Sequence, residues 1–192
     1  MGRYTQNTLS ADITEPVELD EMRDHLIVEH NEHDSYISLL IPAARKVAEN
    51  YIDGVISDRE YTLYLDNFEQ IIELPFRPVD IGSIAIAYTD DDDAPQTIAD
   101  YALEWLTFSV KVKPACGASW PTIETGKDKV QITFTAGYDA AFNEVPPDMK
   151  HAIMMIGATL YDQREDHTAA VELKNVPTSS RLLLDAYRKV TV

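Results

Sequence analysis

Residues 132–138 read Ile-Thr-Phe-Thr-Ala-Gly-Tyr, and residues 145–147 follow them as Val-Pro-Pro. The first stretch alternates apolar and polar side chains, which is typical of a β-strand buried on one face. The two prolines suit the first turn of a helix, where the backbone N–H that proline lacks would have no partner. Together the two stretches mark the point where a block of strands ends and a helical segment begins.

The block of strands extends backward to about residue 59. Apolar side chains recur at every second position, and turn-forming residues separate the runs. This pattern predicts antiparallel strands in a sheet or small sandwich, without a βαβ unit. The predicted strand runs are 61–65, 84–88, 106–112 and 130–134, and the predicted turns are 66–67, 75–80, 90–95 and 113–117.

Helical periodicity replaces the two-residue period on both sides of this block. We expect two helices before it, within residues 18–54, and two after it, within residues 146–190. Neither pair is expected to bury its apolar face alone. The fold class that follows is α+β, a helical core of about four helices with an antiparallel β insertion over about residues 59–138. Residues 1–17 are polar and are expected to form an arm, with a single domain over 18–192.

The second helix is predicted to be amphipathic. Its apolar stripes include Ile37 and Ala44, and its opposite, polar face carries Arg45 and Glu49. Pro42 lies on that polar face and removes one backbone donor, so we expect a bend there and not a break.

The third helix is apolar on nearly every side between residues 152 and 161. A helix of this kind is buried centrally or covered by another subunit. Gly157 is expected to allow close approach by another backbone or a bulky side chain. Candidate residues for subunit or partner contacts are Tyr36, Trp120, Met154, Met155, Gly157, Tyr161, Leu183 and Tyr187.

The bulk charge narrows the range of ligands. The chain of 192 residues has 16 basic and 33 acidic side chains, a formal net charge of −17. Such a charge repels nucleic acid phosphates and anionic membrane surfaces. No apolar run approaches the roughly 20 residues that a membrane-spanning helix needs. Cys116 is the single cysteine, so an intrachain disulfide is impossible.

Several clusters of chemically versatile side chains have simpler interpretations as solvated loops, turns and helix ends. None shows the spacing of a metal site or the nucleophile, base and orienting group that catalysis needs. We therefore predict no enzyme, no cofactor and no catalytic or metal-binding residue. The clusters are His30 with His33, the aspartates at 90–93, Cys116, and residues 162–167.

Three stretches, taken in order, resemble the tailed-phage head–tail connector family, whose members are also called adaptor or head-completion proteins. The first is residues 16–26, Pro-Val-Glu-Leu-Asp-Glu-Met-Arg-Asp-His-Leu. The second joins Ser-Trp-Pro at 119–121 to residues 130–138 and to Val-Pro-Pro-Asp-Met-Lys at 145–150. The third is Tyr-Asp-Gln-Arg-Glu at 161–165, with Val-Pro at 176–177 and Leu-Leu-Leu-Asp-Ala-Tyr-Arg at 182–188.

Two residues depart from the family pattern. Glu18 stands where a serine or threonine helix cap is frequent, and Cys116 stands where an aromatic residue is common.

The resemblance implies a ring, typically of about twelve subunits, seated beneath the portal. Such a ring joins the DNA-filled head to the tail and extends the DNA channel, so residues 18–192 would form a connector domain. Implied partners are the portal protein, a stopper or tail-completion protein, and further copies of the chain. DNA would pass without specific binding, and no membrane is involved. The protein would lie at the head–tail junction of the virion, after assembly in the host cytoplasm.

Two other classes of function remain open from the residues alone. An acidic DNA mimic that inhibits a nucleic-acid-binding protein would use the same negative charge. A metal-dependent hydrolase would use the histidine and acid clusters.

Overall fold

The computed structural model describes residues 3–7, 13–106, 109–139, 144–163 and 178–188. The chain divides into two compact units. A helical unit comprises Thr14–Ser57 with Tyr138–Val192, and a β unit comprises Met1–Ile13 with Asp58–Gly137. A single connector domain over residues 18–192 stays a prediction.

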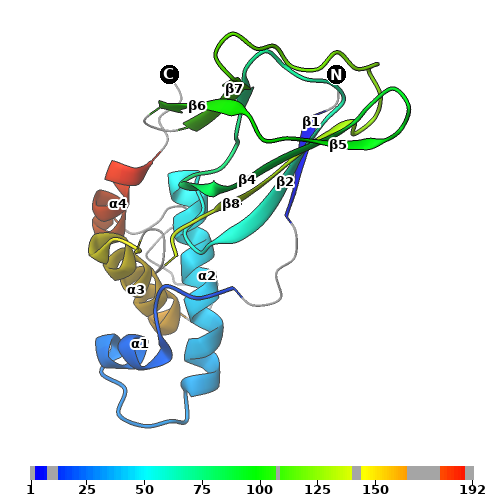
Figure 1. The fold of residues 1–192 in the computed structure, drawn as a ribbon. Coiled ribbons are helices and arrows are strands. Elements are labelled where there is room, and N and C mark those ends of the chain that lie inside the picture. Colours follow the sequence, from blue (N-terminus) through cyan, green and yellow to red (C-terminus); the bar gives the residue numbers. More distant parts are fainter. Residues whose placement is uncertain (1–2, 8–12, 107–108, 140–143, 164–177, 189–192) are drawn as a thin grey trace. The chain divides into compact units, whose positions relative to one another are not determined.

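The helical unit joins helices from both ends of the sequence around one core (Figure 1). Helix α2 packs along α3, while α1 and α4 also contact α3. The predicted packing of the early helices against the late ones is therefore confirmed. The elements are α1 (Leu19–Leu26), α2 (Asp34–Ile52), α3 (Pro147–Asp162), α4 (Thr178–Leu184) and the 3₁₀ turn η1 (Asp185–Tyr187).

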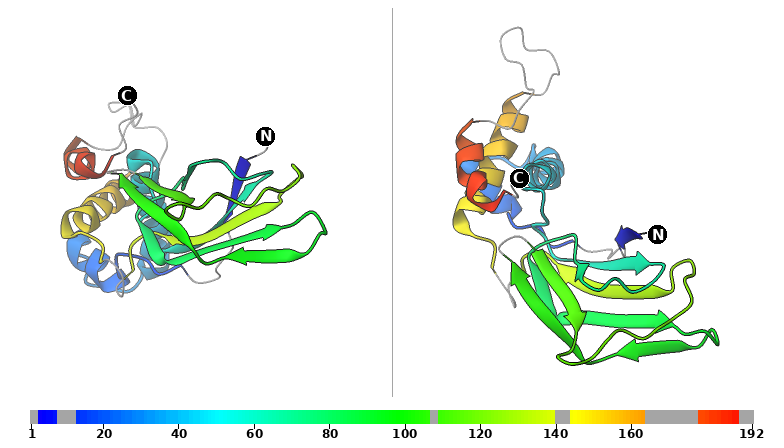
Figure 2. Two further views of the ribbon diagram at one scale, coloured as in Figure 1. Left: turned by 45° about the horizontal axis from the view of Figure 1, so that its top comes forward. Right: turned by 90° about the horizontal axis from the view of Figure 1, so that it is seen from above.

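The core of this unit is apolar and solvent-free. Its members lie at helical spacing, which places one face of each helix in the core. The helices that carry them lie side by side (Figure 2). Pro42 lies within a continuous α2, so the prediction that it does not break the helix is confirmed. Fully or almost fully buried residues are Met22, Ile37, Ile41, Ala44, Ala48, Met149, Ala152, Ile153, Ile156 and Leu184.

The last helix of the structure is shorter than the predicted one. The sequence analysis predicts a continuous amphipathic helix to residue 190, whereas α4 ends at Leu184 and continues as η1. Within it, Leu184 and Ser180 are buried and Leu183 is half-buried. Residues 189–192 lie outside the described part of the chain.

The β unit contains two antiparallel sheets. The described strands make no parallel pairing within either sheet, as the sequence predicts. The first sheet has the order β1 (Arg3–Asn7), β2 (Arg59–Leu65), β8 (Val130–Ala136), β4 (Val79–Thr89), β5 (Pro95–Ile98). The second has the order β3 (Ile72–Glu73), β7 (Ser109–Pro114), β6 (Tyr101–Leu106).

Strand β8, whose alternation opens the sequence analysis, lies at the centre of the larger sheet. Ile132 stands opposite Leu63 of β2 and Ile86 of β4, and all three side chains are buried. The alternation of β8 therefore places its apolar side chains in the core of the β unit.

One strand prediction is wrong. Residues 106–112 do not form one strand, because Leu106 ends β6 and Ser109 begins β7, with Trp105 paired to Val110 across the hairpin. The alternation of side chains continues across the reversal, so periodicity alone could not reveal the turn.

Part of the predicted N-terminal arm is a strand. Arg3–Asn7 pairs with β2 at the edge of the larger sheet, with Thr5 opposite Leu63. The ring of Tyr4 stacks on that of Tyr64 at 5.0 Å, and its hydroxyl donates to Asp128 at 2.9 Å. An edge strand exposes much of its surface, so its polar composition gave no periodic signal.

Candidate functional site

The helices of the helical unit meet at a close contact between α1 and α3. A Cβ added to Gly157 would stand 2.5 Å from the Cε atom of Met22, which is fully buried. The expected close approach at Gly157 is therefore confirmed, and the side chain that approaches belongs to the same chain.

Polar side chains border this contact on the same two helices. Lys150 donates to the carboxylate of Glu21 at 2.5 Å, and Glu21 also accepts the N–H of Glu18 at 2.9 Å. These hydrogen bonds hold the pKa of Glu21 below its usual value. The rings of His25 and His151 meet edge to face at 5.7 Å, and burial together with His151 lowers the pKa of His25.

The predicted polar face of α2 is wrong at two positions. Arg45 and Glu49 are 5% and 3% exposed. The guanidinium of Arg45 lies 2.8 Å from the carboxylate of Glu15 and 3.1 Å from that of Glu49, which also accepts the N–H of Ile56 at 3.1 Å. Burial alone would lower the pKa of Arg45, but the two carboxylates outweigh it and raise that pKa. These contacts tie the segments before α1 and after α2 to the middle of α2.

Two of the predicted interface residues meet where α2 begins and α3 ends. The ring of Tyr36 lies 5.9 Å from that of Tyr161, and its hydroxyl donates to the carbonyl of Leu160 at 3.4 Å. The hydroxyl of Tyr161 is hydrogen-bonded to Nδ1 of His33, and the ring of His33 lies 4.8 Å from that of His30. His33 thus contacts both Tyr161 and His30.

The C-terminal segment is fixed to the helical core through two tyrosines. Tyr51 donates to the carboxylate of Asp185 at 2.5 Å. Tyr187 donates to the carboxylate of Asp148 at 2.9 Å, and burial together with Asp148 raises the pKa of Tyr187 to about 12. Of the predicted interface residues, Leu183 and Tyr187 are half-buried in this packing.

Three predicted interface residues remain, namely Met154, Met155 and Trp120. Met154 and Met155 are half-buried on α3, and Met154 packs against the helical core. Trp120 belongs to the β unit, where its ring stacks on Phe68 at 5.1 Å. The set is divided between the two units, and its role in subunit contacts stays a prediction.

The most exposed apolar side chains of the helical unit were not predicted. Ile27, Leu39 and Leu182 are 84%, 67% and 76% exposed. Ile27 ends α1 with a φ of 57°, in the left-handed region that favours glycine. An isoleucine at the position of a helix C-cap was the one sequence signal that could have drawn attention to it.

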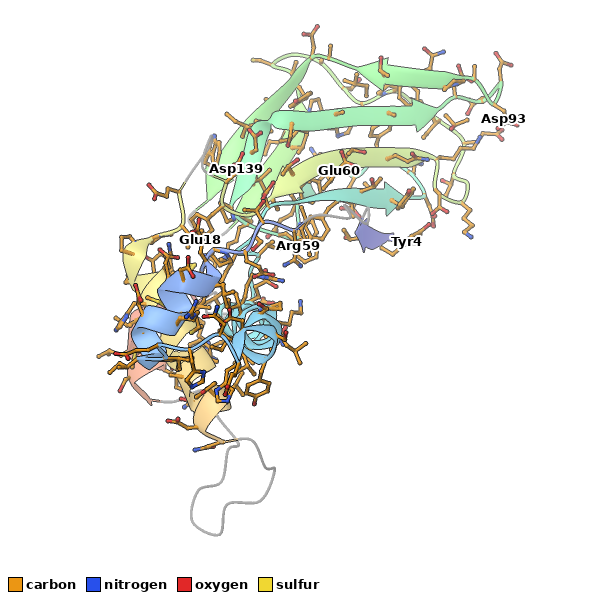
Figure 3. The ribbon with its side chains drawn as sticks, turned by 90° about the horizontal axis from the view of Figure 1, so that it is seen from below. Tyr4, Glu18, Arg59, Glu60, Asp93 and Asp139 are labelled. Atoms are coloured by element: carbon orange, nitrogen blue, oxygen red, sulfur yellow. The ribbon has the colours of Figure 1, made fainter. Side chains whose placement is uncertain are left out.

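The other clusters singled out in the sequence have structural roles where they are described. Asp90–Asp93 forms the tip of the β4–β5 hairpin (Figure 3 labels Asp93), and backbone N–H donation from Ala94 helps to lower the pKa of Asp90. Cys116 is exposed in a turn. Of residues 162–167, those from 164 onward lie outside the described part.

Two further searches of the described residues concern metals and membranes. No group of three or more histidine, cysteine, aspartate or glutamate side chains there is placed to hold a metal ion. Nor does any described helix have the length and apolar character to cross a membrane.

Residues 16–88, which span α1, α2, β2, β3 and most of β4, match the family of phage gp6-like head–tail connector proteins. No curated protein matches the chain.

Solved structures match almost the whole chain. A chain in the neck of an empty gene transfer agent (GTA) particle, computed with C6 symmetry, aligns with a TM-score of 0.78 and 24% identity, over 98% of this chain and 97% of that one. A chain in the virion of the native GTA particle aligns at 0.77 and 24%, over 98% and 96%. A chain in the native neck, computed with C12 symmetry, aligns at 0.69 and 25%, over 98% and 97%.

The predicted resemblance to head–tail connector proteins and the predicted α+β fold class are therefore confirmed. The matches give no support to the DNA-mimic or hydrolase alternatives.

Proposed function

We propose that this chain is a structural virion protein that forms a ring beneath the portal. The ring joins the DNA-filled head to the tail and extends the DNA channel. The observation that carries this proposal is the match of 98% of the chain to a protein of a GTA particle neck, together with the connector family match at 16–88.

The helical unit has the properties that a ring subunit requires. Its apolar core is formed within one chain. A closed ring needs two different faces that meet head to tail. The exposed apolar side chains Ile27 and Leu182 lie on different helical segments and supply such faces.

The proposed partners are the portal protein on the head side and a stopper or tail-completion protein on the tail side. The proposed copy number of about twelve accords with a closed cyclic assembly. The net charge of −17 favours passage of DNA without adhesion, because an acidic wall repels phosphates. The chain performs no catalysis in this role, which accords with a family described by its connecting function.

A reconstitution tests this role. DNA-filled heads made without the chain are mixed with the purified chain and with tails, and the fraction of joined particles is counted by electron microscopy. We expect joining only when the chain is present, and no binding of the chain to heads that lack portal. Equal joining without the chain, or equal binding to portal-free heads, would contradict the role.

A further inference from the structure

A hollow of about 740 Å³ lies at the end of α1. Its charged members are three carboxylates and one guanidinium, and the guanidinium of Arg23 is already held by Asn31 at 3.1 Å and by Asp34 at 3.5 Å. The hollow is therefore acidic toward solvent, with an apolar rim. The lining residues are Asp20, Arg23, Asp24, Ile27, Val28 and Glu29.

Ile27 has no evident role within the subunit. Its side chain is 84% exposed on a left-handed backbone, a conformation that is unfavourable for a β-branched residue. The backbone is fixed there by the N–H of Ile27 on Asp24 O and the N–H of Val28 on Arg23 O. Glycine would relieve the strain, so the backbone conformation gives no reason for an isoleucine at this position.

The C-terminal segment carries the complementary chemistry. Leu182 is 76% exposed on α4, while Ser180 and Leu184, two positions to either side, are buried. The same segment has two arginines, Arg181 and Arg188, and one acid, Asp185, which accepts a hydrogen bond from Tyr51. Both guanidiniums lie over the Tyr51 ring, at 5.8 and 5.3 Å from its centre, and Arg188 is exposed to solvent. A basic segment with a protruding leucine is unusual in a chain of net charge −17.

We propose that the acidic hollow beside Ile27 receives the Leu182 face of α4 from the adjacent subunit of the ring. Apolar contact would join Ile27 to Leu182, and the exposed Arg188 would face the carboxylates. No residue of α4 lines the hollow, so the Leu182 face of the same subunit does not fill it. A contact between two different faces repeats head to tail, as a closed ring requires. This inference rests on the proposed function.

Cross-linking tests the contact directly. Cys116→Ser first removes the single cysteine, and then Ile27→Cys and Leu182→Cys are introduced together or singly. The variants are assembled on portal-containing heads and treated with a short thiol-specific bifunctional cross-linker. We expect the double variant to give a ladder of covalent oligomers, a mixture of the single variants to give dimers only, and each single variant alone to stay monomeric.

Charge introduced at the contact supplies a second measurement. Leu182→Asp is expected to reduce the number of subunits per head at least tenfold. Leu39→Asp is the matched control, because Leu39 is also exposed on a helix but lies outside the proposed contact. Both variants should retain the thermal midpoint of the unaltered chain.

The possible failures are distinguishable. Rings that assemble without a ladder, equal loss in the two aspartate variants, or cross-linking of Leu182→Cys to the portal instead of to its neighbour would overturn the contact and leave the proposed function standing. Dimers from Ile27→Cys alone would show a symmetric contact and overturn it too. Absence of the unaltered chain from portal-containing heads would overturn both.

Discussion

The methyl end of Met22 lies 2.5 Å from the point where a Cβ on Gly157 would stand, and Ala44 of α2 lies 3.8 Å from the same point. Three helices, two from before the strands and one from after them, thus meet at one glycine. The absent side chain is what lets α1 approach α3, and Met22 fills the space completely.

Gly157→Leu should therefore destabilise the helical unit by about 1–3 kcal/mol through overpacking. Urea unfolding followed by circular dichroism measures the change. Met22→Ala in the same background should recover part of the loss, because it empties the space that leucine needs. An unaltered unfolding midpoint in Gly157→Leu would show that the contact is looser than described.

Arg45→Met should destabilise the unit by about 3–5 kcal/mol, because it removes the buried guanidinium that lies 3.1 Å from the buried carboxylate of Glu49. Lys46→Met is the matched control. Lys46 is adjacent in sequence and also near Glu49, but its side chain is 60% exposed, so we expect a change within about 0.5 kcal/mol. Similar losses in the two variants would refute the importance of the buried pair.

Acidification should weaken the helical unit through His25. Its pKa is lowered in the folded state by burial and by His151, so below the unfolded pKa of about 6.5 the unfolded chain binds more protons. Stability is thus fully present above that pKa and is lost as pH falls toward the lower folded pKa. Glu21, whose pKa is also lowered, adds a loss at more acidic pH.

The His25 contribution is measured as the thermal midpoint at pH 7.5 and at pH 5.5. His25→Gln should show a smaller decrease between the two than the unaltered chain. A decrease of equal size in both proteins would exclude His25 as its source.

Tyr187→Phe should loosen the C-terminal segment, since it removes the donor to Asp148 at a cost of about 1 kcal/mol. Hydrogen exchange should become faster in residues 178–187 while the α2 core stays protected. Tyr64→Phe, in the β unit, should leave exchange in 178–187 unaltered. Unchanged exchange in Tyr187→Phe would mean that the segment is held by other contacts.

Much of the helical core could be predicted because its signal is local and periodic. Residues such as Ile37, Ile41 and Ala44 recur at helical spacing and are buried as expected. Strand β8 was equally clear, because a central strand must place its apolar side chains in the core.

The missed features depend on partners that periodicity does not reveal. In the sequence, Arg45 and Glu49 fit a solvated helix face. Their partners, Glu15 and the N–H of Ile56, are known only from the structure. The polar strand β1 carries no alternation because it lies at a sheet edge. Ile27 and Leu182 are apolar but exposed, and the spacing of residues in the sequence cannot distinguish a buried apolar residue from an exposed one.

Imaging of the head–tail junction, with and without this chain, tests the connecting role most directly. Averaged reconstructions should show a ring of density beneath the portal, with the helical unit fitting each repeat, only in particles that contain the chain. A junction with unchanged density and normally attached tails in its absence would contradict the role.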